Sequence, residues 1–115
     1  MIEKTILDYL SGVLTAPVYM EIPEENSGLE YVVLTKIGGS MTDLIPRATF
    51  EILCVSTSLL KAAELCEAVK AAMDNANILP EISKSRYAGD YNATFTAKKS
   101  YRYKAVYEVT YYLER

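Results

Sequence analysis

The chain has 115 residues, a formal net charge of −3 and 50% hydrophobic side chains. This length fits one domain, residues 1–115, with a single buried core, and the composition argues against intrinsic disorder. No apolar run approaches the roughly 18 residues of a membrane span. The N-terminus also lacks the basic and apolar regions of a secretory signal. We therefore expect a one-domain protein without a membrane partner.

Charge is divided unevenly along the chain. Residues 1–82 hold 5 basic and 12 acidic side chains, whereas residues 83–115 hold 7 basic and 3 acidic ones. Such a division is compatible with two separately solvated faces. It is also compatible with complementary surfaces that meet between copies of the chain. The sequence pI of about 5.0 argues against a general nucleic-acid-binding domain, whose pI is usually above ~9.

The N-terminal segment predicts an amphipathic helix. Apolar residues recur at spacings of three and four from Ile2 to Val13, which places them on one helix face. Pro17 ends this helix, because the residue before a proline avoids the helical conformation. A short extended piece follows at 18–22, and the turn-forming residues of 23–28 predict a loop.

Two strands are predicted next. Residues 31–37 are rich in β-branched and aromatic side chains, as strands are. Residues 38–46 contain two glycines and a proline and are predicted to form a loop that is too long for a two-residue hairpin turn. Residues 48–55 form the next predicted strand. Its apolar side chains on both faces indicate an inner position in the sheet.

The clearest prediction is a second helix after Ser56-Thr57-Ser58, whose hydroxyls can cap a helix N-terminus. The helix ends near 75–80, where asparagines and a proline occur. Many alanines favour the helix and permit close packing on a sheet. Its apolar face is predicted to contain Leu59, Ala62, Ala63, Cys66, Val69 and Met73.

The last third of the chain predicts two strands. Residues 82–91 form the weaker one, with a bulge or turn at Gly89-Asp90. Residues 101–113 form the longer one, whose core-facing side is predicted to carry Tyr103, Ala105, Tyr107, Val109, Tyr111 and Leu113. The whole pattern predicts an α+β fold, with a mixed, mostly antiparallel sheet of four to five strands and two helices packed on one face.

No catalytic, metal or cofactor site is predicted. The chain has no histidine, which excludes Ser–His and Cys–His nucleophiles. Cys54 and Cys66 lie in apolar segments and are expected to be buried free thiols of a reducing compartment. Glu21, Glu24 and Glu25 form an acidic cluster without the ligand spacing of a calcium loop.

One stretch has a functional alternative. Lys98-Lys99-Ser-Tyr-Arg-Tyr-Lys104 alternates basic and aromatic side chains, which can bind single-stranded nucleic acid by stacking and by contacts to phosphate. The other interpretation is a charged strand entrance, where lysines prevent unwanted sheet pairing. The glycines that separate the aromatics in RNA-recognition sheets are missing here, which favours the second interpretation.

Two strings carry a family resemblance that extends over about residues 2–113. "RATFEILCVSTSLLKAAELCEAVKAAM" resembles the strand-then-helix centre of small tail-completion proteins from long-tailed bacteriophages and prophages. "YNATFTAKKSYRYKAVYEVTYY" resembles their closing hairpin. The nearest group is the tail-terminator, or head-tail joining, proteins. Other neck proteins and minor capsid proteins have similar lengths and remain alternatives.

The resemblance implies a non-enzymatic virion subunit, present at the tail or neck and in the host cytoplasm during assembly. It implies a hexameric ring that caps the tail tube, docks it to the head-neck proteins and lets DNA pass without sequence-specific binding. Isolated protein can stay monomeric until it meets the tube.

Subunit-interface residues are predicted on the last strand, on the basic tip that precedes it (Lys98 and Lys99) and on the acidic loop. Residues 87–104 are expected to form a protruding hairpin arm that becomes ordered on assembly. Its basic side chains would meet an acidic loop of the next subunit, and three tyrosines would supply the buried area. These tyrosines also have a purely structural interpretation as core, with hydroxyls at the rim. The residues are Lys98, Lys99, Arg102, Lys104, Tyr103, Tyr107, Tyr111, Glu21, Glu24 and Glu25.

Overall fold

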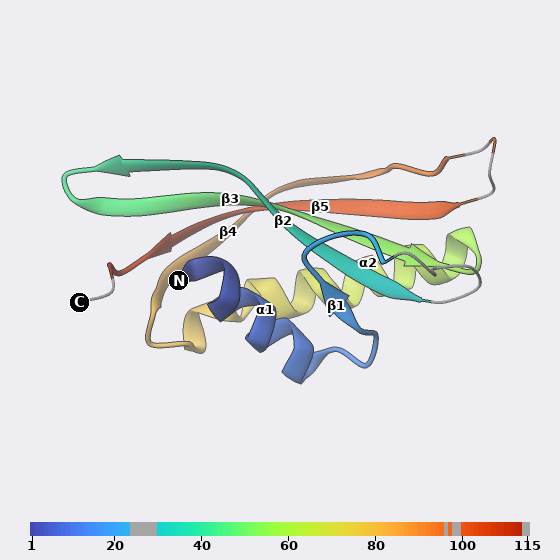
Figure 1. Cartoon of the computed structure of the whole chain (residues 1–115), viewed down its shortest axis with the longest axis horizontal. Helices are drawn as coiled ribbons and strands as arrows, with labels where there is room; N and C mark the ends of the chain where they lie inside the picture. Colours follow the sequence, from blue (N-terminus) through green and yellow to red (C-terminus); the bar gives the residue numbers. More distant parts are fainter. Residues whose placement is uncertain (24–29, 96, 98–99, 114–115) are drawn as a thin grey trace.

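The computed structural model describes residues 1–23, 30–95, 97 and 100–113. Its sheet forms one layer, and both helices cover the same face of it (Figure 1). In chain order the elements are α1 (Ile2–Val13), β1 (Val18–Tyr19), β2 (Tyr31–Thr42), β3 (Ile45–Ser56), α2 (Leu59–Asp74), the 3-10 turn η1 (Ala76–Ile78), β4 (Ile82–Asn92) and β5 (Tyr101–Tyr111).

The sheet has five strands in the order β1-β2-β3-β5-β4. All neighbours are antiparallel except β1, which runs parallel to β2 and pairs with it only at Val18↔Val32 and Tyr19↔Val33. Strand β3 lies in the middle, as the apolar side chains on both of its faces indicated. The predicted α+β class, with a mixed sheet and two helices on one face, is confirmed.

The connection between β2 and β3 differs from its prediction. Residues 38–46 do not form a long loop, because β2 continues to Thr42 and β3 begins at Ile45. Thr42 pairs directly with Ile45, which leaves a two-residue turn of Asp43 and Leu44 with φ angles of 51° and 65°. Positive φ at both central residues is typical of the type I′ turn, whose twist matches that of the flanking strands.

Helix α2 begins and ends where the sequence predicted. The Ser58 side chain accepts a hydrogen bond from the backbone N–H of Lys61 at 3.2 Å, and Asn75 is the C-cap residue. The apolar face is confirmed in its central part, whereas Leu59 is exposed because it lies at the helix start. The buried residues are Ala62, Leu65, Cys66, Val69 and Met73.

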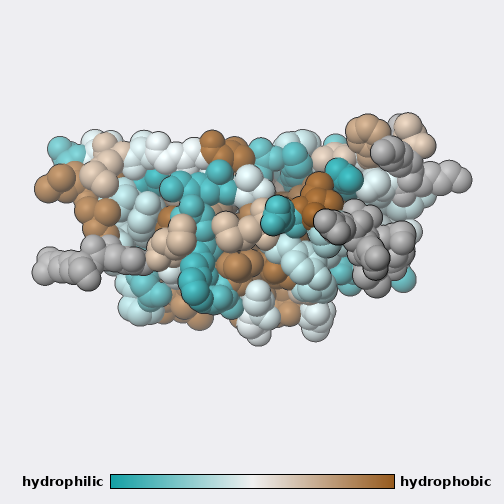
Figure 2. All heavy atoms as spheres, in the orientation of Figure 1, coloured by the Kyte–Doolittle hydropathy of each residue, from teal (hydrophilic) through white to brown (hydrophobic). Residues whose placement is uncertain are grey.

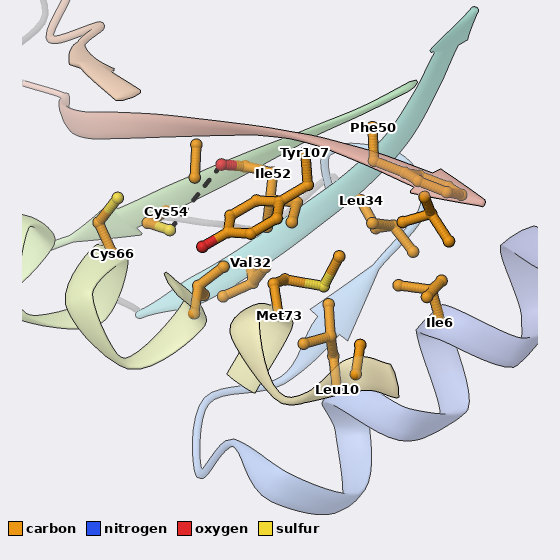
Figure 3. Packing of buried hydrophobic residues seen from close by; sticks show 14 of the residues in the cluster. Ile6, Leu10, Val32, Leu34, Phe50, Ile52, Cys54, Cys66, Met73 and Tyr107 are labelled. Carbon is orange, nitrogen blue, oxygen red and sulfur yellow. Dashed lines mark hydrogen bonds between the residues drawn. The ribbon is translucent and has the colours of Figure 1, made fainter. Parts of the chain in front are cut away.

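The main core lies between the two helices and the covered face of the sheet. Side chains from α1, α2 and the three inner strands meet there (Figure 3), including Ile6, Leu10, Leu34, Phe50, Ile52, Met73 and Tyr107. Cys54 and Cys66 are both buried free cysteines in this core, as expected. The hydrogen bond with Cys66, together with burial, raises the pKa of the Cys54 thiol, so this thiol packs as a neutral group.

Strands β4 and β5 form the predicted hairpin. They pair as far as Asn92↔Tyr103, and an isolated bridge joins Phe95 to Ser100. The register shifts between Tyr87 and Gly89, which confirms the irregularity predicted there. Strand β5 ends at Tyr111, so Leu113 is not part of it and is 52% exposed.

Candidate interaction surfaces

Tyr107 is a core residue and is unavailable to another subunit. Its side chain is 0% exposed. Its hydroxyl oxygen lies within hydrogen-bond distance of two acceptors, Asp74 Oδ1 at 2.7 Å and the backbone carbonyl oxygen of Lys70 at 3.1 Å. Burial is the main cause that raises the pKa of this hydroxyl, and the bond to Asp74 adds to it. The interface role predicted for Tyr107 was therefore wrong, because helix α2 covers this part of β5.

Tyr103 and Tyr111 lie on the same face of β5 at either side of Tyr107. Both are half-buried and pack against the edge of the core. They have the location predicted for tyrosines whose rings line the core and whose hydroxyls reach the rim. Their contribution to a subunit interface stays a prediction.

Lys104 and Arg102 lie on the face of the sheet opposite the helices, and both have partners within the chain. Lys104 Nζ pairs with Glu51 Oε1 of the neighbouring strand at 2.8 Å, and this hydrogen bond raises the pKa of Lys104. Arg102 Nε donates to Ser100 Oγ at 2.9 Å. Lys104 therefore already has a carboxylate partner without a neighbouring subunit, which the interface prediction did not anticipate.

Of the remaining predicted interface residues, the structure describes Glu21 but not the others. Glu21 follows β1 and is exposed. Glu24, Glu25, Lys98 and Lys99 lie outside the described residues. The proposed contact between the acidic loop and the basic tip stays a prediction.

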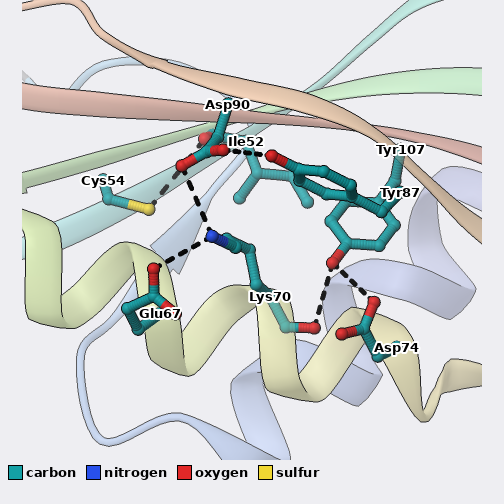
Figure 4. Close-up of polar contacts among 8 residues, drawn as sticks. All are labelled: Ile52, Cys54, Glu67, Lys70, Asp74, Tyr87, Asp90 and Tyr107. Carbon is teal, nitrogen blue, oxygen red and sulfur yellow. Dashed lines mark hydrogen bonds and ion pairs between the residues drawn. The ribbon is translucent and has the colours of Figure 1, made fainter.

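A polar cluster joins helix α2 to the edge strand β4 (Figure 4). Lys70 Nζ lies 2.9 Å from Glu67 Oε1 and 3.4 Å from Asp90 Oδ2. The Tyr87 hydroxyl donates to Asp90, and this bond is the main cause that lowers the Asp90 pKa. Tyr87 also packs edge-on against Tyr107, with ring centroids 5.7 Å apart. These contacts hold the edge strand β4 against helix α2 and fix the positions of the Tyr87 and Asp90 side chains.

The β2–β3 hairpin provides an exposed apolar surface that the sequence analysis missed. The hairpin extends beyond both helices at one end of the molecule (Figure 1), and hydrophobic atoms are visible at this end (Figure 2). Met41, Leu44 and Ile45 are 51%, 79% and 46% exposed. The glycines and the proline of residues 38–46 favoured a loop, and Asp43-Leu44 is not a dipeptide that predicts a two-residue hairpin turn.

Basic side chains lie beside this apolar tip. A hollow of about 310 Å³ is lined by Leu44, Ile45, Arg47, Lys84 and the segment 110–113. Among the described residues, neither Arg47 nor Lys84 takes part in an ion pair. We call Met41, Leu44, Ile45, Arg47 and Lys84 the hairpin surface.

A second exposed apolar surface lies where helix α2 begins. Leu59 and Leu60 are 41% and 70% exposed, and Glu64 follows Leu60 by one helical turn on the same side. Glu30 accepts a hydrogen bond from Ser56 Oγ at 3.2 Å, which places this carboxylate near the same end of β3. We call Leu59, Leu60, Glu30 and Glu64 the α2-end surface.

The described residues contain no group of three His, Cys, Asp or Glu side chains that could hold a metal ion. No helix in the part of the chain that the structure describes is long and apolar enough to cross a bilayer. In comparisons with known proteins, no family model and no curated sequence matches this chain.

Proposed function

We propose that this chain is a non-enzymatic structural subunit of a phage or prophage virion. In this proposal it is a tail terminator, or head-tail joining protein, that forms a ring on the end of the tail tube and docks the tube to the head. The sequence resemblance of its central and closing segments supports this function. The observation that carries it is the hairpin that extends past the helices and exposes apolar side chains at its tip.

A ring subunit needs two different surfaces, because a head-to-tail contact repeats around an axis and closes the ring. Exposed apolar surface bordered by charged side chains is common at sites of protein association. The hairpin surface and the α2-end surface both have this character. Six subunits, the tail tube protein and the neck proteins are the proposed partners, with DNA passing through the ring.

The decisive experiment combines purified protein with tail tubes. Light scattering after gel filtration measures the mass of the isolated protein, and negative-stain micrographs show whether rings cap the tube ends. Capped tubes would support the proposal, whereas monomers and dimers that never bind tube ends would contradict it. Particles without this protein separate the alternatives, because unregulated tail length and tails detached from heads indicate different roles.

A salt-dependent gel shift on single-stranded DNA or RNA tests the rival function. Contacts to phosphate weaken steeply with salt. The pairing of Lys104 with Glu51 and of Arg86 with Glu108 leaves mixed charge on the uncovered face of the sheet. We therefore expect no shift at physiological ionic strength.

A further inference from the structure

The hairpin surface and the α2-end surface lie at opposite ends of the molecule. Strand β3 starts at Ile45, beside the hairpin turn, and ends at Ser56, three residues before helix α2. Its 12 residues span about 40 Å in an extended strand, which is most of the 45 Å long axis. One copy of the chain can therefore use both surfaces at once, on two different neighbours.

The two surfaces are complementary in charge. Arg47 and Lys84 border the apolar tip of the hairpin surface, whereas Glu30 and Glu64 border the apolar residues of the α2-end surface. Among the described residues, Asp43 in the turn and Lys61 on the helix have the opposite sign to their own surface. Glu108 also lies beside Arg47 and Lys84, but it is paired with Arg86. The balance is positive at the hairpin and negative at the helix, which orients an encounter between unlike ends and disfavours one between like ends.

The central apolar residues of both surfaces are among the most exposed large hydrophobic residues in the part of the chain that the structure describes. Leu44 and Leu60 are 79% and 70% exposed, and the positive φ of Leu44 places a leucine where a turn usually has glycine or asparagine. Neither leucine belongs to the core clusters of the chain. Contact between copies would bury both side chains.

We infer that the hairpin surface of one copy binds the α2-end surface of the next copy, with Leu44 and Leu60 at the centre of the contact. Because the two surfaces differ, the contact is heterologous and leaves one free surface of each kind on every dimer. Further copies add in the same way. This inference deepens the proposed function, since it names the surfaces by which the ring would assemble.

Cysteine cross-linking tests this pairing even when association is weak. The variants Leu44→Cys and Leu60→Cys are mixed and treated with a short bismaleimide, which joins thiols only where they approach. The native Cys54 and Cys66 are buried, so the wild-type protein measures their background. Val13→Cys is the matched control, because Val13 is an apolar residue on α1 that is 53% exposed and outside both surfaces.

The expected result is a 44–60 cross-linked dimer, several times more abundant than 44–44, 60–60 or 44–13 dimers, and less abundant at high salt. No excess over the Val13 control would overturn the inference. Dominant 44–44 or 60–60 products would overturn it too, because they indicate contacts between like surfaces.

The assay for binding to tube ends shows whether a negative result contradicts this inference or the proposed function. If wild-type protein caps tail tubes but no 44–60 excess appears, the function stands and this contact is wrong. If the 44–60 dimer forms and tubes are never capped, the chain self-associates as inferred and the proposed function is wrong. As a further check, Leu44→Asp is expected to prevent the formation of complete rings.

Discussion

The hydroxyl of Tyr107 in β5 lies 2.7 Å from Oδ1 of Asp74, the last residue of α2 (Figure 4). This bond joins the end of the longer helix to the centre of the sheet. It also explains how a fully buried tyrosine on a core strand satisfies its polar atom, since a buried hydroxyl without a partner is costly. The tyrosine-rich last strand is in this respect a structural feature of the fold.

Replacing Tyr107 with phenylalanine should lower the free energy of unfolding by about 1–2 kcal/mol, the value of a hydrogen bond to a charged group. Urea denaturation measures the loss. The matched control is a double-mutant cycle with Asp74→Ala, in which the two losses should not add. Fully additive losses would show that the hydroxyl and the carboxylate do not interact.

Tyr107 also predicts a dependence on alkaline pH. Burial, with the bond to Asp74 adding to it, raises the pKa of Tyr107 in the folded protein above its usual value of about 10, so the folded state holds this proton more tightly than the unfolded chain does. The contribution to stability is complete below pH 10 and is lost as pH rises toward the folded pKa. Denaturation midpoints from pH 8 to 11 should therefore fall less in Tyr107→Phe than in wild type.

Asp90 predicts a dependence of the opposite sign. Its pKa is lowered in the folded state from 3.8, chiefly by the hydrogen bond from Tyr87. The resulting stability is present above about pH 4 and is lost as pH falls through the folded pKa. Asp90→Asn should be less stable than wild type at pH 7, and the difference should shrink in acid. A difference that is unchanged down to pH 2 would contradict the assignment.

The β2–β3 turn predicts a stabilising substitution. Leu44 has φ of 65°, a conformation that costs a non-glycine residue roughly 1–2 kcal/mol. Leu44→Gly removes this cost but makes the unfolded chain more flexible, so a net gain of about 0.5–1 kcal/mol is expected. Asp43→Gly is the matched control and should gain less, because aspartate tolerates the left-handed region better. A lower denaturation midpoint for Leu44→Gly would argue against the turn.

Helix α2 depends on its N-terminal cap. Ser58→Ala removes the acceptor for the Lys61 N–H and should cost about 1 kcal/mol. Thr57→Ala is a suitable control, since Thr57 is an exposed neighbour outside the helix. Equal losses in the two variants would mean that the cap contributes nothing specific.

Sequence patterns within a single segment were enough to predict the two helices and the inner strand β3. Helix α2 was predicted between its serine cap and Asn75 because apolar periodicity, alanine content and capping chemistry agree along one segment. The inner position of β3 followed from the apolar residues on both of its faces. The amphipathic pattern of each helix predicted that both helices pack on the sheet.

The surfaces could not be predicted in the same way, because they depend on register between distant segments. The pairing Leu53↔Lys104 brings Lys104 beside Glu51, and nothing near residue 104 in the sequence indicates this partner. The turn at Asp43-Leu44 lacks the Asn-Gly or Asp-Gly signal of a two-residue hairpin. Alternation along β5 correctly predicted that Tyr107 faces the core, but how completely it is covered depends on where α2 crosses the sheet.

The exposure of the outer part of the β2–β3 hairpin affects both its local stability and its tolerance of substitutions. Beyond the register shift between Lys36 and Gly38, every residue of β2 is exposed. Segments with few buried contacts open locally at a small free-energy cost while the rest of the protein stays folded. Amide protons at 38–45 should thus exchange with solvent much faster than those of β5. Away from the two turn residues, substitutions at this tip are then nearly independent of folding, so the exposed positions can change while the core sequence stays the same.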